Sequence, residues 1–245
     1  MKAMILAAGV GLRLRPLTDQ TPKALIEIAG TPILEIVIRR LIKAGVDGMV
    51  INLHHFPEKI KEFVVQKKNF GIKIQFSHEP ELLDTGGGLK KTAKFFDDGE
   101  PFFLHNADVL SDIDLVKMCR FHAEKKALAT LAVSHRESGR YLLFDREGLL
   151  VGRERTTEKR IEWAASPVDP VERLAFAGIH VISPAIFKNM TSEGAFSIIE
   201  TYLKSAGQGK KVLAFNTNDC YWSDIGSAEK LQTARQHADQ RGLRQ

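Results

Sequence analysis

Short apolar segments alternate with segments of helical periodicity along the first 134 residues of the chain. Apolar runs of this length, bounded by glycine or polar residues, are typical of strands buried on both faces. The alternation predicts βαβ units and an α/β fold, a Rossmann-like three-layer sandwich with a mostly parallel central sheet. The expected strands cover residues 4–8, 49–53, 72–76, 101–105 and 127–134, and the expected helices cover residues 32–45, 57–67, 87–96 and 113–126.

After residue 134 the strands become shorter and the segments between them less regular. Strands at 141–144 and 149–153 flank Asp145-Arg146-Glu147-Gly148, a turn sequence that predicts a hairpin. Residues 154–173 hold many charges and two prolines, and we expect an irregular excursion there. The remaining expected elements are a strand at 176–182, a helix at 196–205, a strand at 211–215 and a helix at 227–240.

The size of the chain suits one domain. It has 245 residues, of which 44% are hydrophobic, enough for a substantial core. We expect a single domain, residues 1–245, made of one half at 1–134, a second half at 135–226 and a C-terminal helix at 227–245.

A long loop between residues 9 and 32 follows the first expected strand. Loops of this length are uncommon in compact domains unless they are functional. Gly9 and Gly11 would let backbone N–H groups approach an anion, and two prolines stiffen the loop. The basic residues of the loop, which could bind phosphate, are Arg13, Arg15 and Lys23.

Two common phosphate-binding patterns do not describe this loop. A dinucleotide fingerprint requires glycine at its sixth position, where this chain has Leu14, and it opens a helix directly. A Walker loop ends in Gly-Lys followed by Ser or Thr, and that ending is absent. These differences argue against a nicotinamide dehydrogenase.

The loop resembles the signature of the sugar-1-phosphate nucleotidyltransferases. The similar residues are Leu6-Ala7-Ala8-Gly9-Val10-Gly11-Leu12-Arg13, Pro22-Lys23-Ala24-Leu25 and Thr31-Pro32-Ile33. Further family motifs follow in the family's order: Leu83-Asp84-Thr85-Gly86-Gly87, Asn106-Ala107-Asp108-Val109, Phe176-Ala177-Gly178-Ile179 and Trp222-Ser223-Asp224-Ile225-Gly226.

This resemblance covers nearly the whole chain and is strongest to short bacterial members. These include N-acetylmuramate-1-phosphate uridylyltransferases and mannose- or heptose-1-phosphate guanylyltransferases. The resemblance implies the nucleotide-diphospho-sugar transferase fold, with a nucleotide-binding half at 1–134 and a sugar-phosphate-binding half, containing a small sugar-binding β subregion, at 135–226.

The implied reaction joins an NTP and a sugar 1-phosphate into an NDP-sugar with release of pyrophosphate. The nucleophilic phosphate is already ionised, so the reaction calls for cations, a metal and positioning. A lone Asp in a loop is usually a turn or cap residue, but two carboxylates on one rim can hold Mg²⁺. The family places this metal at positions matching Asp108 and Asp224. The implied catalytic residues are Arg13, Lys23, Asp108 and Asp224.

The resemblance also implies residues that bind the two substrates. For the nucleotide they are Ala7, Ala8, Gly9, Gly11, Leu12, Arg13, Glu79, Thr85, Gly86 and Gly87. The N–H groups of Gly86 and Gly87 are expected to read an edge of the base. For the sugar 1-phosphate they are Lys23, Asn106, Gly139, Gly178 and Glu200.

The chain departs from the larger relatives at a Glu-Lys-Pro motif whose Lys contacts the sugar phosphate. The corresponding region reads Lys159-Arg160-Ile161-Glu162-Trp163-Ala164-Ala165-Ser166-Pro167. Lys159 and Arg160 are the candidates left for that contact.

Composition limits the other partners. The net charge is +5, but no basic cluster is interleaved with aromatic residues, so we expect no nucleic-acid partner. The apolar run near the N-terminus is too short for a signal peptide or a membrane span, which favours the cytoplasm and no membrane partner. Two cysteines form neither a disulfide framework nor a metal motif.

Two questions stay open at this stage. The oligomeric state is one of them, and a homo-oligomer is compatible with the sequence. A non-catalytic regulatory subunit that binds a sugar nucleotide on the same fold is the alternative function. The histidines, including adjacent His54 and His55 and the strand residue His105, are expected to be structural or surface residues.

Overall fold

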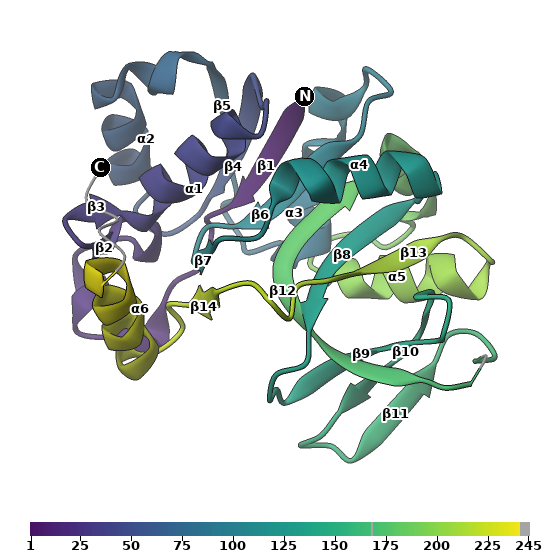
Figure 1. Ribbon diagram of the computed structural model, residues 1–245. Coiled ribbons are helices and arrows are strands. Elements are labelled where there is room, and N and C mark those ends of the chain that lie inside the picture. The colour runs from purple at the N-terminus through teal and green to yellow at the C-terminus, as the bar shows by residue number, and fades with distance from the viewer. Residues whose placement is uncertain (168, 241–245) are drawn as a thin grey trace. The chain divides into compact units, whose positions relative to one another are not determined.

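The structure is a computed structural model that describes residues 1–167 and 169–240. The described residues form two compact units (Figure 1). Unit 1 contains residues 1–82, 105–113 and 220–240, and unit 2 contains residues 83–104, 114–167 and 169–219.

Three parallel strands form the centre of unit 1, in the order β1, β4, β5. Met4 lies opposite Val50, and Val50 lies opposite Gln75. All six residues of the middle strand are buried. The strands and the helices that join them are β1 (Lys2–Leu6), α1 (Ile33–Lys43), β4 (Gly48–Leu53), α2 (Pro57–Gln66) and β5 (Lys73–His78).

The ends of α1 follow the predicted signals. The helix begins directly after Pro32, and Gly45 lies beyond its end with a φ of +90°. The Gly45 N–H donates to the Ile42 carbonyl at 2.9 Å, and the Val46 N–H donates to the Leu41 carbonyl at 3.0 Å. Carbonyls that the helix leaves without partners at its C-terminus are thereby satisfied.

Two short antiparallel pairs and a helix complete unit 1. They are β2 (Glu27–Ile28) with β3 (Thr31–Pro32), β7 (Val109–Ser111) with β14 (Trp222–Asp224), and α6 (Ala228–Gln240). The sequence did not predict β7 or β14, because three-residue strands carry almost no periodicity. The predicted C-terminal helix reaches residue 245, and residues 241–245 lie outside the described part of the chain.

Unit 2 is built on mostly antiparallel strands, in the order β11, β10, β9, β12. β8 pairs with β12 in antiparallel fashion and with β13 in parallel fashion. Its elements are α3 (Asp84–Lys91), the first residues of β6 (Phe102–Asn106), α4 (Leu115–Lys125), β8 (Ala129–Ser134), β9 (Arg140–Phe144), β10 (Leu150–Arg155), β11 (Arg160–Trp163), β12 (Glu172–Ile182), α5 (Ile198–Gly207) and β13 (Val212–Asn216). Short 3₁₀ segments occur in both units: η4 (Lys68–Gly71), η5 (Ala93–Phe96) and η6 (Pro184–Asn189).

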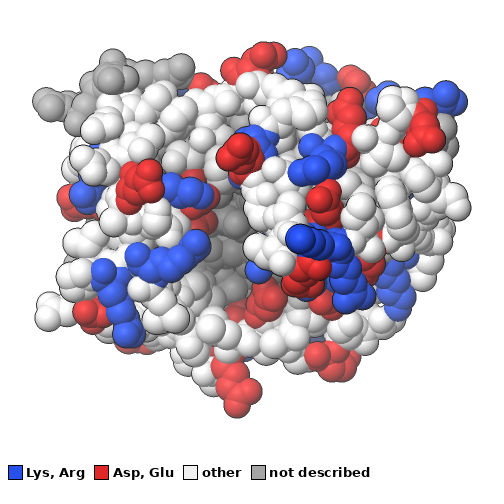
Figure 2. Space-filling model, turned by 90° about the horizontal axis from the view of Figure 1, so that it is seen from below, with Lys and Arg blue, Asp and Glu red and all other residues white. Residues whose placement is uncertain are grey.

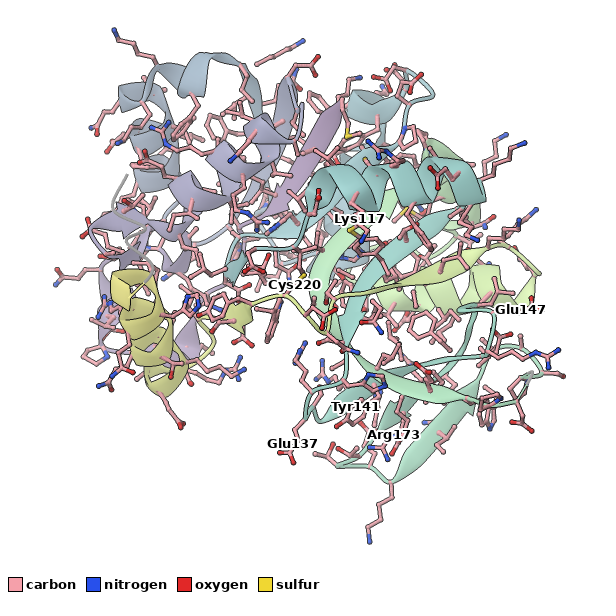
Figure 3. The ribbon with its side chains drawn as sticks, viewed as in Figure 1. Lys117, Glu137, Tyr141, Glu147, Arg173 and Cys220 are labelled. Atoms are coloured by element: carbon pink, nitrogen blue, oxygen red, sulfur yellow. The ribbon has the colours of Figure 1, made fainter. Side chains whose placement is uncertain are left out.

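The long strand β12 changes partners along its length. Residues 172–174 pair with β9, whereas residues 175–182 pair with β8, and the second register is irregular between Phe176 and His180. Near the β9 end, Arg173 places its guanidinium carbon 4.5 Å from the centre of the Tyr141 ring (Figure 3). This cation–π contact ties β9 and β12 together on one face.

One predicted segment was wrong. Residues 154–173 were expected to be irregular, yet β10 continues to Arg155 and Arg160–Trp163 forms β11. Glu162 pairs with Arg153 across the two strands, with 2.7 Å between Nη2 and the carboxylate oxygen. This cross-strand ion pair stabilises the pairing of β11 with β10.

The predicted fold class is confirmed: the protein is mixed α/β with a mostly parallel central sheet. The predicted halves, 1–134 and 135–226, differ from the compact units, because residues 83–104 belong to unit 2 and residues 220–240 return to unit 1. The single-domain organisation stays a prediction.

Candidate functional site

The loop after β1 contains three short 3₁₀ turns, η1 (Leu12–Leu14), η2 (Leu17–Asp19) and η3 (Lys23–Leu25). Gly11 has a φ of +72°, and its carbonyl accepts a hydrogen bond from Thr18 Oγ1 at 2.9 Å. A Cβ on Gly11 would lie 2.9 Å from Thr18 Cγ2 and 3.2 Å from Lys23 Cβ. The loop therefore folds back on itself, and glycine is required where Lys23 packs against it.

The beginning of the loop is more open. A Cβ added to Gly9 would have no heavy atom within 4 Å, and Leu12 is 61% exposed. Ala7 and Ala8, by contrast, are buried. Nucleotide binding by this segment stays a prediction, and the space around Gly9 is compatible with it.

Lys23 and Asp108 form an ion pair between Nζ and Oδ2. The Lys23 side chain is 14% exposed and the Asp108 side chain is 28% exposed. Partial burial makes the attraction between the two charges stronger than it would be in bulk water. Asp108 lies between β6 and β7, so the ends of two strands fix the position of its carboxylate.

Asp224 lies beside Asp108 because β14 pairs with β7. In that pair Asp224 is opposite Val109, and the Ile225 N–H donates to the Asp108 carbonyl at 3.0 Å. Asp224 Oδ1 accepts a hydrogen bond from the Gly226 N–H at 2.7 Å. Two carboxylates more than one hundred positions apart in the chain are thus held at neighbouring backbone positions by the β7–β14 pair.

Arg13 belongs to the same cluster. A Cβ built on Gly226 would lie 2.4 Å from Asp224 Oδ1 and 3.1 Å from Arg13 Nη2. The guanidinium and the Asp224 carboxylate are therefore both next to Gly226. Unit 1 brings together all four predicted catalytic residues, namely Arg13, Lys23, Asp108 and Asp224.

The two carboxylates form a donor set that suits Mg²⁺. This ion binds oxygen ligands and usually takes one or two carboxylates together with substrate phosphates and water. Within residues 1–167 and 169–240 there is no group of three or more His, Cys, Asp or Glu side chains that could hold a metal. A cation held by Asp108 and Asp224 would complete its coordination with ligand phosphates, and the residues present fit Mg²⁺ on that basis.

Asn52, in the buried strand β4, connects the loop after β1 to Glu79. Its Oδ1 accepts a hydrogen bond from the Ala7 N–H at 2.7 Å, and its Nδ2 donates to Glu79 Oε1 at 2.8 Å. Glu79 is only 1% exposed, so this geometry favours a supporting role over direct contact with a base. Asn52 was not predicted as a site residue, although an Asn inside an apolar strand pattern is a usable signal.

Arg40 is a second residue that the sequence analysis did not place in the site. It donates from Nη1 to Ser111 Oγ at 2.8 Å and from Nη2 to the Ile113 carbonyl at 2.7 Å. Burial lowers the pKa of Arg40, and the nearby Asp112 partly opposes that effect. Arg40 thereby anchors β7, the strand that directly follows Asp108. In the sequence, Arg40 stands out as a charged residue on the apolar face of the helix predicted at residues 32–45.

His105 is fully buried, and its Nδ1 donates to the Asn106 carbonyl at 2.8 Å. Burial lowers the pKa of His105 to about 3, so the ring is neutral near neutral pH. This agrees with the structural role expected of it. Substrate binding by the Asn106 side chain stays a prediction.

The glycines of α3 are packed in the interior of unit 2. The N–H groups of Gly86 and Gly87 both donate to the Phe196 carbonyl, at 2.8 and 3.3 Å. The expectation that these N–H groups are free to read a base edge is therefore not met. The helix also begins at Asp84 and ends at Lys91, whereas residues 87–96 were predicted. Membership of the two glycines in a nucleotide site stays a prediction.

Gly86→Ala is expected to lower the free energy of unfolding by about 1–3 kcal/mol, the usual cost of overpacking an interior. A Cβ there would lie 2.4 Å from Phe196 Cε2 and 2.8 Å from the Phe196 carbonyl oxygen. Urea unfolding followed by circular dichroism measures the effect. Gly139→Ala is the matched control, because its Cβ would have no neighbour closer than 3.9 Å. Equal losses of stability in the two variants would contradict this explanation of Gly86.

Thr85 links the start of α3 to the start of α5. Its Oγ1 accepts a hydrogen bond from the Ile198 N–H at 3.0 Å. Glu200 lies in the first turn of α5 and is exposed. The position of Glu200 near the Thr85 contact is compatible with a role at a ligand, which stays a prediction.

The other residues predicted for the sugar side lie on different elements of unit 2. Gly139 precedes β9, and its carbonyl accepts a hydrogen bond from the Thr156 N–H at 3.1 Å. Gly178 has a φ of +74° and lies in the irregular stretch of β12. Lys159 and Arg160 are exposed at the start of β11. Their proposed contacts with a sugar phosphate stay predictions.

Charge is mixed over the molecular surface seen in Figure 2. Basic and acidic side chains are interspersed on that face, in small groups of each sign, among the residues that the structure describes. None of the described helices combines the length and the apolar character that a membrane span requires.

The sequence of this chain is similar to those of known proteins. The sequence matches the family model described as "Nucleotidyl transferase" over residues 2–241. The mannose-1-phosphate guanylyltransferase catalytic subunit beta of Danio rerio is 32% identical, over 98% of this chain and 68% of that protein. The mannose-1-phosphate guanyltransferase of Yarrowia lipolytica is 31% identical, over 92% of this chain and 61% of that protein. The chain thus spans 61–68% of the length of these two relatives.

Solved structures share the fold at lower sequence identity. UDP-glucose pyrophosphorylase complexed with UDP-glucose matches with a TM-score of 0.79 and 17% identity, over 98% of both chains. The inositol-1-phosphate CTP transferase from T. maritima matches with a TM-score of 0.75 and 18% identity, over 97% of this chain and 96% of that one. These matches confirm the predicted fold type.

Proposed function

Because this chain belongs to the nucleotidyl transferase family, we propose that it transfers a nucleotidyl group from an NTP to a sugar 1-phosphate and releases pyrophosphate. The observation that carries the proposal is the cluster in unit 1. Asp108 directly precedes β7 and Asp224 lies on β14, which pairs with β7, with Lys23 on Asp108 and Arg13 beside Asp224. Such a combination of carboxylates and cations is what phosphoryl chemistry between two polyanions requires.

The reaction is an in-line displacement at the α-phosphorus. A phosphate oxygen of the sugar 1-phosphate forms the new bond, and the bond to the bridging oxygen of the β-phosphate breaks. The electron pair of that bond leaves with pyrophosphate. Since the nucleophile is ionised near neutral pH, no side chain has to remove a proton from it.

The named residues would then position and neutralise the phosphates. Lys23, held in place by Gly11 and Asp108, presents an ammonium group where reacting phosphates would lie. Arg13 offers a planar guanidinium that can bind two phosphate oxygens at once. Asp108 and Asp224 would hold Mg²⁺, which when bound supplies positive charge to the phosphate oxygens.

GTP and mannose 1-phosphate are the first substrates to test. Two relatives named as mannose-1-phosphate guanylyltransferases are 31–32% identical to this chain, although it spans only part of their length. The short bacterial enzymes that the sequence resembles also use UTP with N-acetylmuramate 1-phosphate, or GTP with a heptose 1-phosphate. The choice of base and sugar depends on contacts outside the unit 1 cluster.

A pyrophosphate-release assay tests the proposal directly. Each of the common NTPs is paired with mannose, heptose, glucose and N-acetylmuramate 1-phosphates, with Mg²⁺ or with EDTA. We expect release with at least one pair, dependent on both substrates and abolished by EDTA. Tight binding of a sugar nucleotide without turnover of any pair would instead identify a regulatory subunit.

A further inference from the structure

Lys230 lies next to the cluster but is not explained by the family motifs. It is in the first turn of α6, and its Nζ lies 2.5 Å from Asp224 Oδ2. The same ammonium lies 5.9 Å from the centre of the Trp222 ring. The side chain is 50% exposed, so one side of the ammonium faces water while the other contacts the carboxylate.

Each of the two aspartates is paired with one lysine. Lys23 pairs with Asp108, and Lys230 pairs with Asp224, in both cases through Oδ2. Two carboxylates at neighbouring backbone positions repel each other, and the ammonium groups relieve that repulsion. A divalent cation that binds both aspartates must therefore compete with these lysines for carboxylate oxygens.

An ordinary surface ion pair is the simplest alternative for Lys230, and such pairs usually contribute little. Two features set this pair apart. Asp224 is only 22% exposed, and its other oxygen accepts the Gly226 N–H, so the carboxylate is fixed in direction. Arg13 lies beside the same carboxylate, so Lys230 adds a second cation at the position where phosphates would enter.

We propose that Lys230 is a further nucleotide-binding residue, which rests on the function proposed above. Without ligand it pairs with Asp224. When a nucleotide enters with a divalent cation, Asp224 would hold the cation, and the flexible stem of Lys230 would let its released ammonium contact the phosphates. The pairing thus keeps the carboxylate neutralised before binding and supplies a phosphate contact afterwards.

The proposal predicts opposite effects of Lys230→Met on two measurable affinities. Manganese(II) alone, titrated into the full chain and followed by electron paramagnetic resonance, should bind about two- to fivefold more tightly, because a competing cation is gone. The KM for the metal–NTP complex should rise about three- to tenfold, because a phosphate contact is lost. A residue with only a structural role would not move the two values in opposite directions.

Lys61→Met is the matched control. Lys61 is also in unit 1 and forms an ion pair with Glu58 at 2.8 Å, on helix α2. It should change neither manganese affinity nor KM. Lys230→Arg should restore most of the nucleotide affinity, because it keeps the charge.

The outcomes separate this proposal from the function on which it rests. If the wild-type chain binds manganese and turns over substrate, and Lys230→Met leaves either affinity unchanged, the role of Lys230 is overturned while the function stands. Weaker manganese binding in Lys230→Met overturns it as well. If the wild-type chain neither binds manganese nor releases pyrophosphate, the proposed function fails and Lys230 fails with it.

Discussion

Asp108→Asn is expected to lower the turnover number about 10³-fold, which corresponds to about 4 kcal/mol in the activation barrier. The amide has the same shape as the carboxylate but carries no charge, so it binds a divalent cation much more weakly and forms no ion pair with Lys23. Asp224→Asn should have a similar effect, because Asp224 lies on β14, opposite Val109, the residue that follows Asp108. Steady-state pyrophosphate release at saturating Mg²⁺ measures both variants.

Two controls accompany these variants: their thermal stability, and a variant that removes a different carboxylate from unit 1. The variants should unfold close to the wild-type temperature, because the backbone bond from Ile225 to the Asp108 carbonyl does not involve the side chain. Asp47→Asn removes a carboxylate from unit 1 that is 80% exposed and pairs with the N-terminus. It should keep wild-type turnover. Near wild-type turnover in both Asp108→Asn and Asp224→Asn would contradict the metal assignment.

Lys23→Met should lower kcat/KM about 10²- to 10³-fold, the usual cost of losing one group that stabilises a transition-state charge. Methionine keeps the unbranched side chain that packs against Gly11 but removes the ammonium. A fall in kcat, not only a rise in KM, is expected, because the contact is to phosphates that react. Initial rates measured over a range of concentrations of both substrates separate the change in kcat from the change in KM.

Arg15→Met is the control for Lys23→Met. Arg15 is in the same loop, its side chain is 61% exposed, and it pairs with Asp19 at 3.2 Å. Its loss should leave kcat/KM nearly unchanged. A comparable loss in both variants would show that the loop acts only through its overall positive charge.

Hydrophobic periodicity predicted the parallel part of the fold well. The α1 helix was expected from its apolar spacing, Pro32 and Gly45, and β4 was expected from a continuous apolar run. The same reasoning missed β7 and β14, whose residues meet only after the chain has folded. It also missed β11, an edge strand whose alternation of charged and apolar residues covers only four positions.

The site was predictable in its residue types but not in its geometry. Family motifs indicated Arg13, Lys23, Asp108 and Asp224, yet their proximity depends on the β7–β14 pair. The glycines of α3 were read as open N–H donors, whereas Gly86 is needed because Phe196 leaves no room for a Cβ. A sequence pattern states that glycine is required, but it does not distinguish close packing from contact with a ligand.

Attack on the α-phosphorus by a sugar 1-phosphate determines which product receives each phosphate of the NTP, so labelled phosphate distinguishes this reaction from other phosphoryl transfers. NTP labelled with ³²P at the α or the γ position is incubated with the sugar 1-phosphate and Mg²⁺, and the products are separated by chromatography. We expect the α label in the NDP-sugar and the γ label in pyrophosphate. Transfer of the γ label to the sugar phosphate, with the α label left in an NDP, would contradict it.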